Sequence, residues 1–203
     1  MNSQVKALAL AAAAALAGFG AVYVTLGGRD NAAQPLQPAQ KAAAPTAGGR
    51  LSVGEMAAFV YKKAPEPLSQ IAFKLKSGEE VTLARWQGRV VLLNLWATWC
   101  APCRKEMPAL DRLQAELGSR DFEVVALAVD RAGTEAAAKF LAQVDVKSLG
   151  LYIDGTARAG TSLKAVGLPT TILIDRQGRE IGRLTGPAEW DSADAKRLVR
   201  SAL

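Results

Sequence analysis

The stretch that decides the fold is residues 90–107, which read VVLLNLWATWCAPCRKEM. Its first part, Val90–Trp96, is a nearly continuous apolar run, which is typical of a central strand that is covered on both faces. After the cysteines, Arg104–Leu117 carries apolar residues at helical spacing. The stretch therefore predicts a buried strand that leads directly into a helix, with Cys100 at the junction and Cys103 one turn further on.

Strand and helix patterns alternate on both sides of this stretch. The expected strands are Ile71–Lys76, Glu80–Leu83, Val90–Trp96, Glu123–Val129, Thr170–Asp175 and Glu180–Leu184. The expected helices are Leu51–Lys63, Arg104–Leu117, Thr134–Val144 and Asp191–Ala202. A strand–helix–strand unit followed by strand–strand–helix implies an α/β fold with a mixed central sheet flanked by helices.

The position of Cys100 favours redox chemistry. Free N–H groups and the positive end of the helix dipole stabilise a negative charge at a helix N-terminus, and a thiolate is such a charge. Cys100 should therefore be the attacking sulfur, and Cys103 is close enough to resolve the mixed disulfide that results. Pro102 stiffens the turn where a missing N–H costs little.

The alternative is a structural disulfide or an inert pair of core thiols. A disulfide that closes so short a loop removes little entropy from the unfolded chain, which makes it a poor structural crosslink. The chain has two Cys and no His. This excludes a multi-disulfide framework, a four-cysteine zinc site and a histidine-activated nucleophile. We expect no metal and no cofactor.

The N-terminus predicts a membrane anchor, residues 1–26. Within it Ala7–Leu26 is uncharged, and about 20 helical residues span the roughly 30 Å of a bilayer's hydrocarbon core. A cleaved secretory signal and a buried soluble helix remain as alternatives. Lys6 lies before the stretch, whereas Arg29 and Asp30 cancel after it, so the rest of the chain should be exported.

Residues 27–50 are rich in Ala, Gly, Gln and Pro and predict a flexible linker, so the folded domain should span 51–203. The formal net charge is +6, but Lys and Arg are scattered through the sequence. Without a basic run or a basic–aromatic pattern, we expect no nucleic-acid partner.

A second motif is Gly167-Leu168-Pro169-Thr170, directly before an apolar strand. Proline is ordinary at the first residue of a strand. Beside a cysteine pair, however, a cis Pro169 could lie against the disulfide, and Leu168 could offer its backbone groups to an extended substrate segment.

These residues carry a family resemblance. Asn94–Pro108 resembles the active-site segment of membrane-anchored bacterial thioredoxin-like proteins, in particular the TlpA type of thiol:disulfide interchange protein, and Gly186–Asp191 is similar as well. The resemblance covers the chain from about Glu66 to the end. It implies a thioredoxin fold with an inserted segment between Arg131 and Lys164, and a cis Pro169.

The resemblance also implies a function in the bacterial inner membrane, with the catalytic domain in the periplasm. Such a protein reduces protein disulfides and receives its electrons from a membrane donor. TlpA-type proteins are similar to reductases of copper-delivery factors and of an oxidase subunit in cytochrome oxidase assembly. Close relatives instead reduce apocytochrome c before haem attachment.

One residue departs from thioredoxin proper, which has a buried Asp where this chain has Asn94. In the exported relatives a Glu three residues after the second Cys is a candidate for the proton transfer, and here that residue is Glu106. A carboxylate near the thiols could accept the proton of Cys103. The alternative is an ordinary residue on the helix surface.

The remaining predicted site residues contact the substrate: Trp99, Ala101, Pro102, Leu168 and Pro169. Trp96 and Trp99 are expected to lie in the core or to shield the sulfurs. Arg104 and Lys105 are expected to form a solvated face rather than a binding patch.

Three other functions compete with that of a reductase. A strong oxidant of folding proteins carries a His between its cysteines, which Ala101-Pro102 lacks. A thiol peroxidase needs companion residues that are not evident around the cysteines. A copper carrier could use the two thiolates, but no His or Met cluster completes such a site.

Overall fold

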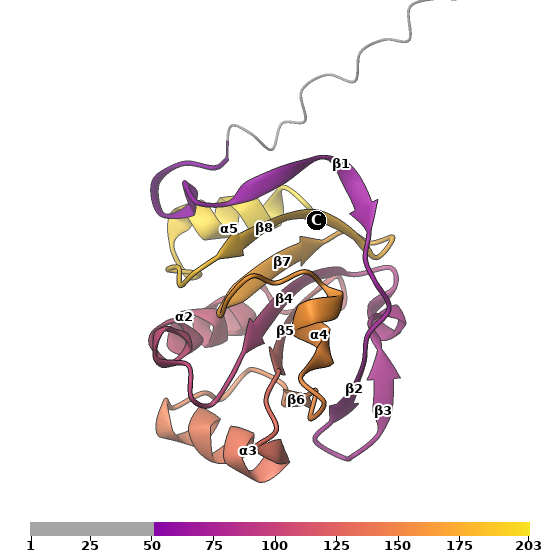
Figure 1. Cartoon of the computed structure of the whole chain (residues 1–203). Helices are drawn as coiled ribbons and strands as arrows, with labels where there is room; N and C mark the ends of the chain where they lie inside the picture. The colour runs from indigo at the N-terminus through magenta and orange to yellow at the C-terminus, as the bar shows by residue number, and fades with distance from the viewer. Residues whose placement is uncertain (1–50) are drawn as a thin grey trace, which may run out of the picture. The chain divides into compact units, whose positions relative to one another are not determined.

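The computed structural model describes residues 51–203 (Figure 1). The predicted anchor and linker, residues 1–26 and 27–50, lie outside the described residues. Among residues 51–203, no helix has both the length and the apolar character needed to cross a membrane.

A mixed sheet runs through the described part of the chain, with its strands in the order β1-β8-β7-β4-β5-β6-β2-β3. The strands are β1 Val60–Pro67, β2 Ala72–Leu75, β3 Glu80–Thr82, β4 Val90–Trp96, β5 Phe122–Ala128, β6 Tyr152–Ile153, β7 Thr170–Ile174 and β8 Arg179–Thr185. The helices are α2 Ala101–Leu117, α3 Gly133–Gln143, α4 Arg158–Ser162 and α5 Ala193–Arg200, with short 3-10 turns η2 at Gly54–Met56 and η3 at Leu83–Trp86.

Strand β4 lies in the middle of this sheet, parallel to β5 and antiparallel to β7. All of its residues are buried, because each face is covered. Val90, Leu92 and Trp96 pack into the core under α2, α3 and α5. The alternate residues, Leu93 among them, pack on the other side with α4, η3 and the β2–β3 hairpin (Figure 1). The apolar run predicted this two-sided burial correctly.

Most of the predicted elements are confirmed to within a few residues. β2 and β3 form an antiparallel hairpin whose turn includes Ser77 and Gly78. Gly78 has φ +90°, a conformation that favours glycine. The thioredoxin-like α/β fold with a mixed sheet and flanking helices is therefore correct. The segment between Arg131 and Lys164 holds α3, β6 and α4, and β6 extends the sheet beside β5.

The predicted helix over Leu51–Lys63 is wrong. Only η2 is helical there, and the chain becomes β1 from Val60. The reason is a distant partner, because β1 pairs antiparallel with β8 and places Tyr61 opposite Gly182. A Cβ on Gly182 would come within 2.6 Å of the Phe59 ring, so this glycine makes room for the close contact. Tertiary pairing overrides the local helical pattern.

Candidate functional site

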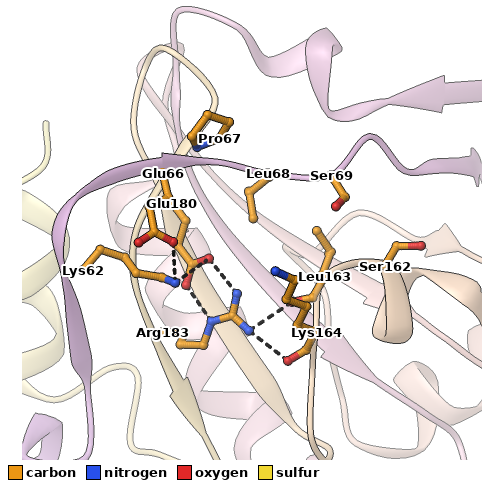
Figure 2. Close-up of a pocket in the computed structure, with 10 residues that line it drawn as sticks. All are labelled: Lys62, Glu66, Pro67, Leu68, Ser69, Ser162, Leu163, Lys164, Glu180 and Arg183. Atoms are coloured by element: carbon orange, nitrogen blue, oxygen red, sulfur yellow. Dashed lines mark hydrogen bonds and ion pairs between the residues drawn. The ribbon is translucent and has the colours of Figure 1, made fainter. Parts of the chain in front are cut away.

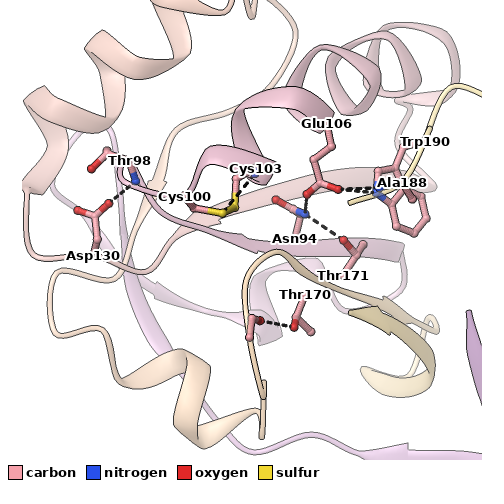
Figure 3. Close-up of a disulfide and its surroundings, with 11 residues drawn as sticks. Asn94, Thr98, Cys100, Cys103, Glu106, Asp130, Thr170, Thr171, Ala188 and Trp190 are labelled. Atoms are coloured by element: carbon pink, nitrogen blue, oxygen red, sulfur yellow. Dashed lines mark hydrogen bonds between the residues drawn. A yellow bond between two sulfur atoms is a disulfide. The ribbon is translucent and has the colours of Figure 1, made fainter. Parts of the chain in front are cut away.

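The disulfide between Cys100 and Cys103 lies where β4 leads into α2 (Figure 3). Cys100 is the N-cap of the helix, and its sulfur accepts a hydrogen bond of 3.2 Å from the backbone N–H of Cys103. Cys100 is 4% exposed and Cys103 is fully buried, so the first sulfur has the better access to a partner. After reduction, the helix N-terminus stabilises a thiolate on Cys100.

The segment before β7 reaches the same end of the sheet. Because β7 runs antiparallel to β4 with Thr170 opposite Leu95, the residues before Thr170 lie beside the chain that leads to Cys100. The Leu168–Pro169 peptide bond is cis, as the resemblance implied. The Thr170 hydroxyl donates a 2.7 Å hydrogen bond to the carbonyl oxygen of Gly167. The two motifs singled out in the sequence thus meet at one end of the sheet.

Glu106 is buried rather than exposed on the helix surface. It lies one turn after Cys103 on α2 and is 3% exposed. Its carboxylate accepts three hydrogen bonds: from Asn94 Nδ2 at 2.7 Å, from the Ala188 N–H at 3.2 Å and from Trp190 Nε1 at 3.3 Å (Figure 3). Helical spacing of three places the Glu106 and Cys103 side chains on the same face of α2.

Burial dominates the proton affinity of this carboxyl. Desolvation raises the pKa of Glu106 from its ordinary 4.5 to about 7, and the hydrogen bonds from Asn94, Ala188 and Trp190 oppose the rise. A carboxyl that titrates near neutral pH can both accept and return a proton there. The geometry therefore suits Glu106 for exchanging a proton with the neighbouring thiol pair.

Asn94 connects the carboxylate to β7. Besides Glu106, its amide nitrogen donates a hydrogen bond of 2.9 Å to the Thr171 hydroxyl, and both Asn94 and Thr171 are fully buried. Asn94 cannot exchange protons itself, so in this site it supports the carboxylate that can.

The predicted substrate-contact residues differ in exposure. Trp99 is 73% exposed, and Ala101 and Pro102 are exposed beside the disulfide. Leu168 is partly buried and Pro169 is buried. Trp99 is thus not a core residue, whereas the expectation of burial holds for Trp96, which is fully buried.

Sequence reasoning missed Asp130, which follows β5. It is 5% exposed, and its carboxylate accepts a hydrogen bond of 2.7 Å from the backbone N–H of Thr98 (Figure 3). The backbone N–H of Ala132 donates a second bond to it, also at 2.7 Å. These bonds tie the loop that carries Cys100 to the end of β5. The available signal was an Asp directly after a buried strand that is parallel and adjacent to β4.

The Arg104 side chain contacts α3. Its guanidinium lies 4.6 Å from the centroid of the Phe140 ring, and Nη2 donates to Gln143 Oε1 at 3.0 Å. Arg104 and Lys105 are both exposed. The contacts of Arg104 make it a link between α2 and α3.

Comparisons with known proteins agree with this geometry. The family model described as Redoxin matches residues 60–199. ResA, a thiol-disulfide oxidoreductase of Bacillus cereus, is 39% identical over 111 residues, which are 54% of this chain and 62% of ResA. HelX, a thiol:disulfide interchange protein of Rhodobacter capsulatus, is 32% identical over 105 residues, 51% of this chain and 56% of HelX. The matches thus span less than two thirds of these relatives.

Among solved structures, one assigned to the thiol:disulfide interchange protein DsbE of Chlorobium tepidum is 32% identical, with a TM-score of 0.61. The match covers 68% of this chain and 96% of that structure. The resemblance to exported thioredoxin-like proteins is therefore confirmed.

Proposed function

Because the chain belongs to the Redoxin family, we propose that it is a dithiol–disulfide oxidoreductase that reduces disulfides in other proteins. The observation that carries the proposal is the position of the disulfide. Cys100 caps the N-terminus of α2 and has Cys103 one turn behind it, at the end of the sheet where the cis Pro169 loop also lies. A structural crosslink would need neither the helix terminus nor the loop.

The reaction follows from the roles of the two sulfurs. The Cys100 thiolate attacks one sulfur of a substrate disulfide, which forms a mixed disulfide and releases the other substrate sulfur as a thiolate. Cys103 then gives up its proton, for which Glu106 is the nearby acceptor, and attacks the Cys100 sulfur. The second substrate sulfur leaves, and the protein is left with the Cys100–Cys103 disulfide.

A dithiol donor must return two electrons before the next cycle. We propose that this donor is a membrane protein and that Ala7–Leu26 anchors the chain in the inner membrane, with residues 51–203 as the catalytic domain in the periplasm. Residues 27–50 then act as the tether.

The proposed substrate is an oxidised apocytochrome c, whose cysteines must be reduced before haem attachment. The relatives named ResA, HelX and DsbE support this role better than the oxidase-assembly role, in which a copper-delivery factor or an oxidase subunit would be reduced. The exposed Trp99, Ala101 and Pro102, with the backbone of Leu168, form the proposed contact face for the substrate.

The test uses the full chain in its own host, with Cys103 replaced by serine so that the mixed disulfide cannot be resolved. We expect apocytochrome c to be trapped on Cys100, and the Cys100→Ser variant to trap nothing. A trapped copper-delivery factor or oxidase subunit without apocytochrome c would move the protein to oxidase assembly. If the Cys103→Ser chain forms no mixed disulfide with any protein, the proposed reductase activity is wrong.

A further inference from the structure

A buried carboxylate pairs with a partly buried arginine outside the disulfide site, on β8 (Figure 2). Glu180 is 3% exposed, and both of its carboxylate oxygens bond to Arg183: Nε donates to Oε1 and Nη2 donates to Oε2, each at 2.6 Å. Lys62 of β1 approaches Oε2 at 3.8 Å. A charge this deeply buried persists only when it is paired and hydrogen-bonded, and the two-pronged guanidinium meets that need.

An irregularity in β8 makes this pair possible. Residues three apart on a regular strand point to opposite faces of the sheet. Here Gly182 is opposite Leu173 while Glu180 is opposite Ile174, so β8 holds one extra residue at Ile181. Such a bulge redirects the side chains that precede it. It brings Glu180 to the same side as Arg183.

The free end of the same guanidinium reaches another part of the chain. Arg183 Nη1 donates to the carbonyl oxygens of Leu163 at 3.0 Å and Lys164 at 3.2 Å (Figure 2). These carbonyls directly follow α4, where the last carbonyls of a helix have no partner within the helix. Lys164 has φ +55°, a left-handed conformation that a residue other than glycine keeps only when its surroundings hold it.

The chain held in this way is the start of the loop that ends at the cis Pro169. The other end of the loop is fixed by β7 and by the bond between the Thr170 hydroxyl and the Gly167 carbonyl. Between these two attachments Val166 is 90% exposed, whereas Ala165 and Leu168 are partly buried against the core.

The start of the loop is held in two ways. The backbone N–H groups of Lys164 and Ala165 donate to carbonyl oxygens of α4 at 3.0 and 2.8 Å. Arg183 holds the same turn from β8, so it is the side chain that ties the path of residues 164–168 to the sheet.

We infer that Arg183, oriented by Glu180, is a positioning residue that holds the 164–168 loop so that Leu168 can present its backbone to a substrate segment. This inference rests on the proposed reductase function. Four donor–acceptor contacts use three nitrogens of one planar group, and the single ammonium of a lysine cannot replace them. Neither residue touches the reacting sulfurs, so their effect acts through the loop.

Two variants test the inference in the oxidised full chain. Arg183→Lys keeps the positive charge but loses the planar guanidinium that donates to both oxygens of Glu180 and to the loop carbonyls. The double variant Glu180→Gln with Arg183→Met removes the buried negative charge of Glu180 together with the positive charge that pairs with it. Arg179→Met is the control, because Arg179 lies on the same strand but pairs with Asp175 at the turn between β7 and β8. Amide hydrogen exchange of residues 163–168 should become about tenfold faster or more in the two test variants and stay unchanged in the control.

Kinetics give the second measurement. With the reduced protein, the test variants should raise KM for a disulfide-bonded peptide by about tenfold, at a kcat within about twofold of wild type. A small aromatic disulfide does not need the loop, so its rate of reduction should stay within about twofold of wild type. The rate of Cys100 alkylation should depend on pH as it does in the wild-type protein.

The outcomes separate the two proposals. Unchanged exchange at 163–168 in folded variants would overturn the positioning role, even if the wild-type protein is an active reductase. The positioning role would also be overturned if the rates of reduction of the peptide and of the small disulfide fell equally and the pH dependence of Cys100 alkylation shifted. Glu180 and Arg183 would then act on the thiols and not on the loop. A wild-type protein that reduces no peptide disulfide would sink the reductase proposal, and the exchange measurement would still decide whether Arg183 holds the loop.

Discussion

Replacing Glu106 with glutamine should change how the stability of the oxidised protein depends on pH. Burial raises the pKa of Glu106 from 4.5 to about 7 in the folded chain, against the opposing effect of its three hydrogen-bond donors. The folded state therefore binds this proton more tightly than the unfolded state does. The stabilisation is fully present below about pH 4.5 and is lost as pH rises through about 7.

The size of the effect follows from the two pKa values of 4.5 and about 7. For one such group, the free energy of unfolding should fall by about 2.5 kcal/mol between about pH 5 and pH 8.5. Glutamine has nearly the same shape and no charge. The glutamine amide accepts hydrogen bonds from Asn94 and Trp190 less well than the carboxylate does, so the substitution lowers stability at every pH. Because glutamine does not titrate, the substitution also removes the contribution of Glu106 to the slope of the free energy of unfolding against pH.

Urea denaturation of residues 51–203 in the oxidised state, at half-unit steps over this range, measures the slope directly. The control is Glu189→Gln, which removes an exposed carboxylate from the surface beside Glu106 and should leave a curve parallel to that of wild type. If Glu106→Gln also runs parallel to wild type, the buried carboxyl takes up no proton in this pH range and Glu106 is not the proton acceptor for Cys103.

Three further predictions concern neighbouring residues. Trp99→Ala should change stability by less than about 0.5 kcal/mol, because the side chain is 73% exposed, yet raise KM for a peptide disulfide; an unchanged KM would remove Trp99 from the contact face. Asp130→Ala leaves two backbone N–H groups beside the cysteine loop without their acceptor and should cost about 1–3 kcal/mol in urea denaturation, so a cost near zero would contradict this role. Trp190→Phe removes one donor from Glu106, so the pKa of Glu106 should rise further and the pH-dependent loss of stability should move to higher pH; a shift to lower pH would refute that reasoning.

The parts of the fold that sequence predicted well are those in which local pattern and tertiary environment agree. β4 is apolar along its length and is covered on both faces, so its bounds of Val90–Trp96 were predicted to the residue. The contact between Cys100 and Cys103 was also predicted from local sequence, because the helix that brings the two sulfurs together starts between them. The prediction for Leu51–Lys63 failed because the partner of β1 is β8, more than a hundred residues away.

In the candidate site, too, local sequence predicted the position of a residue but not its surroundings, and Glu106 is the clearest case. Spacing alone places Glu106 one turn after Cys103, but it could not decide between a surface residue and a buried proton acceptor. That decision depends on the segment around Ala188 and Trp190, more than eighty residues further along, which covers the carboxylate and also donates to it. The same segment therefore both raises the pKa of Glu106 by excluding water and limits the rise through its hydrogen bonds. Because these effects have opposite signs, the pH range in which Glu106 can accept a proton is set by how closely that segment packs on α2.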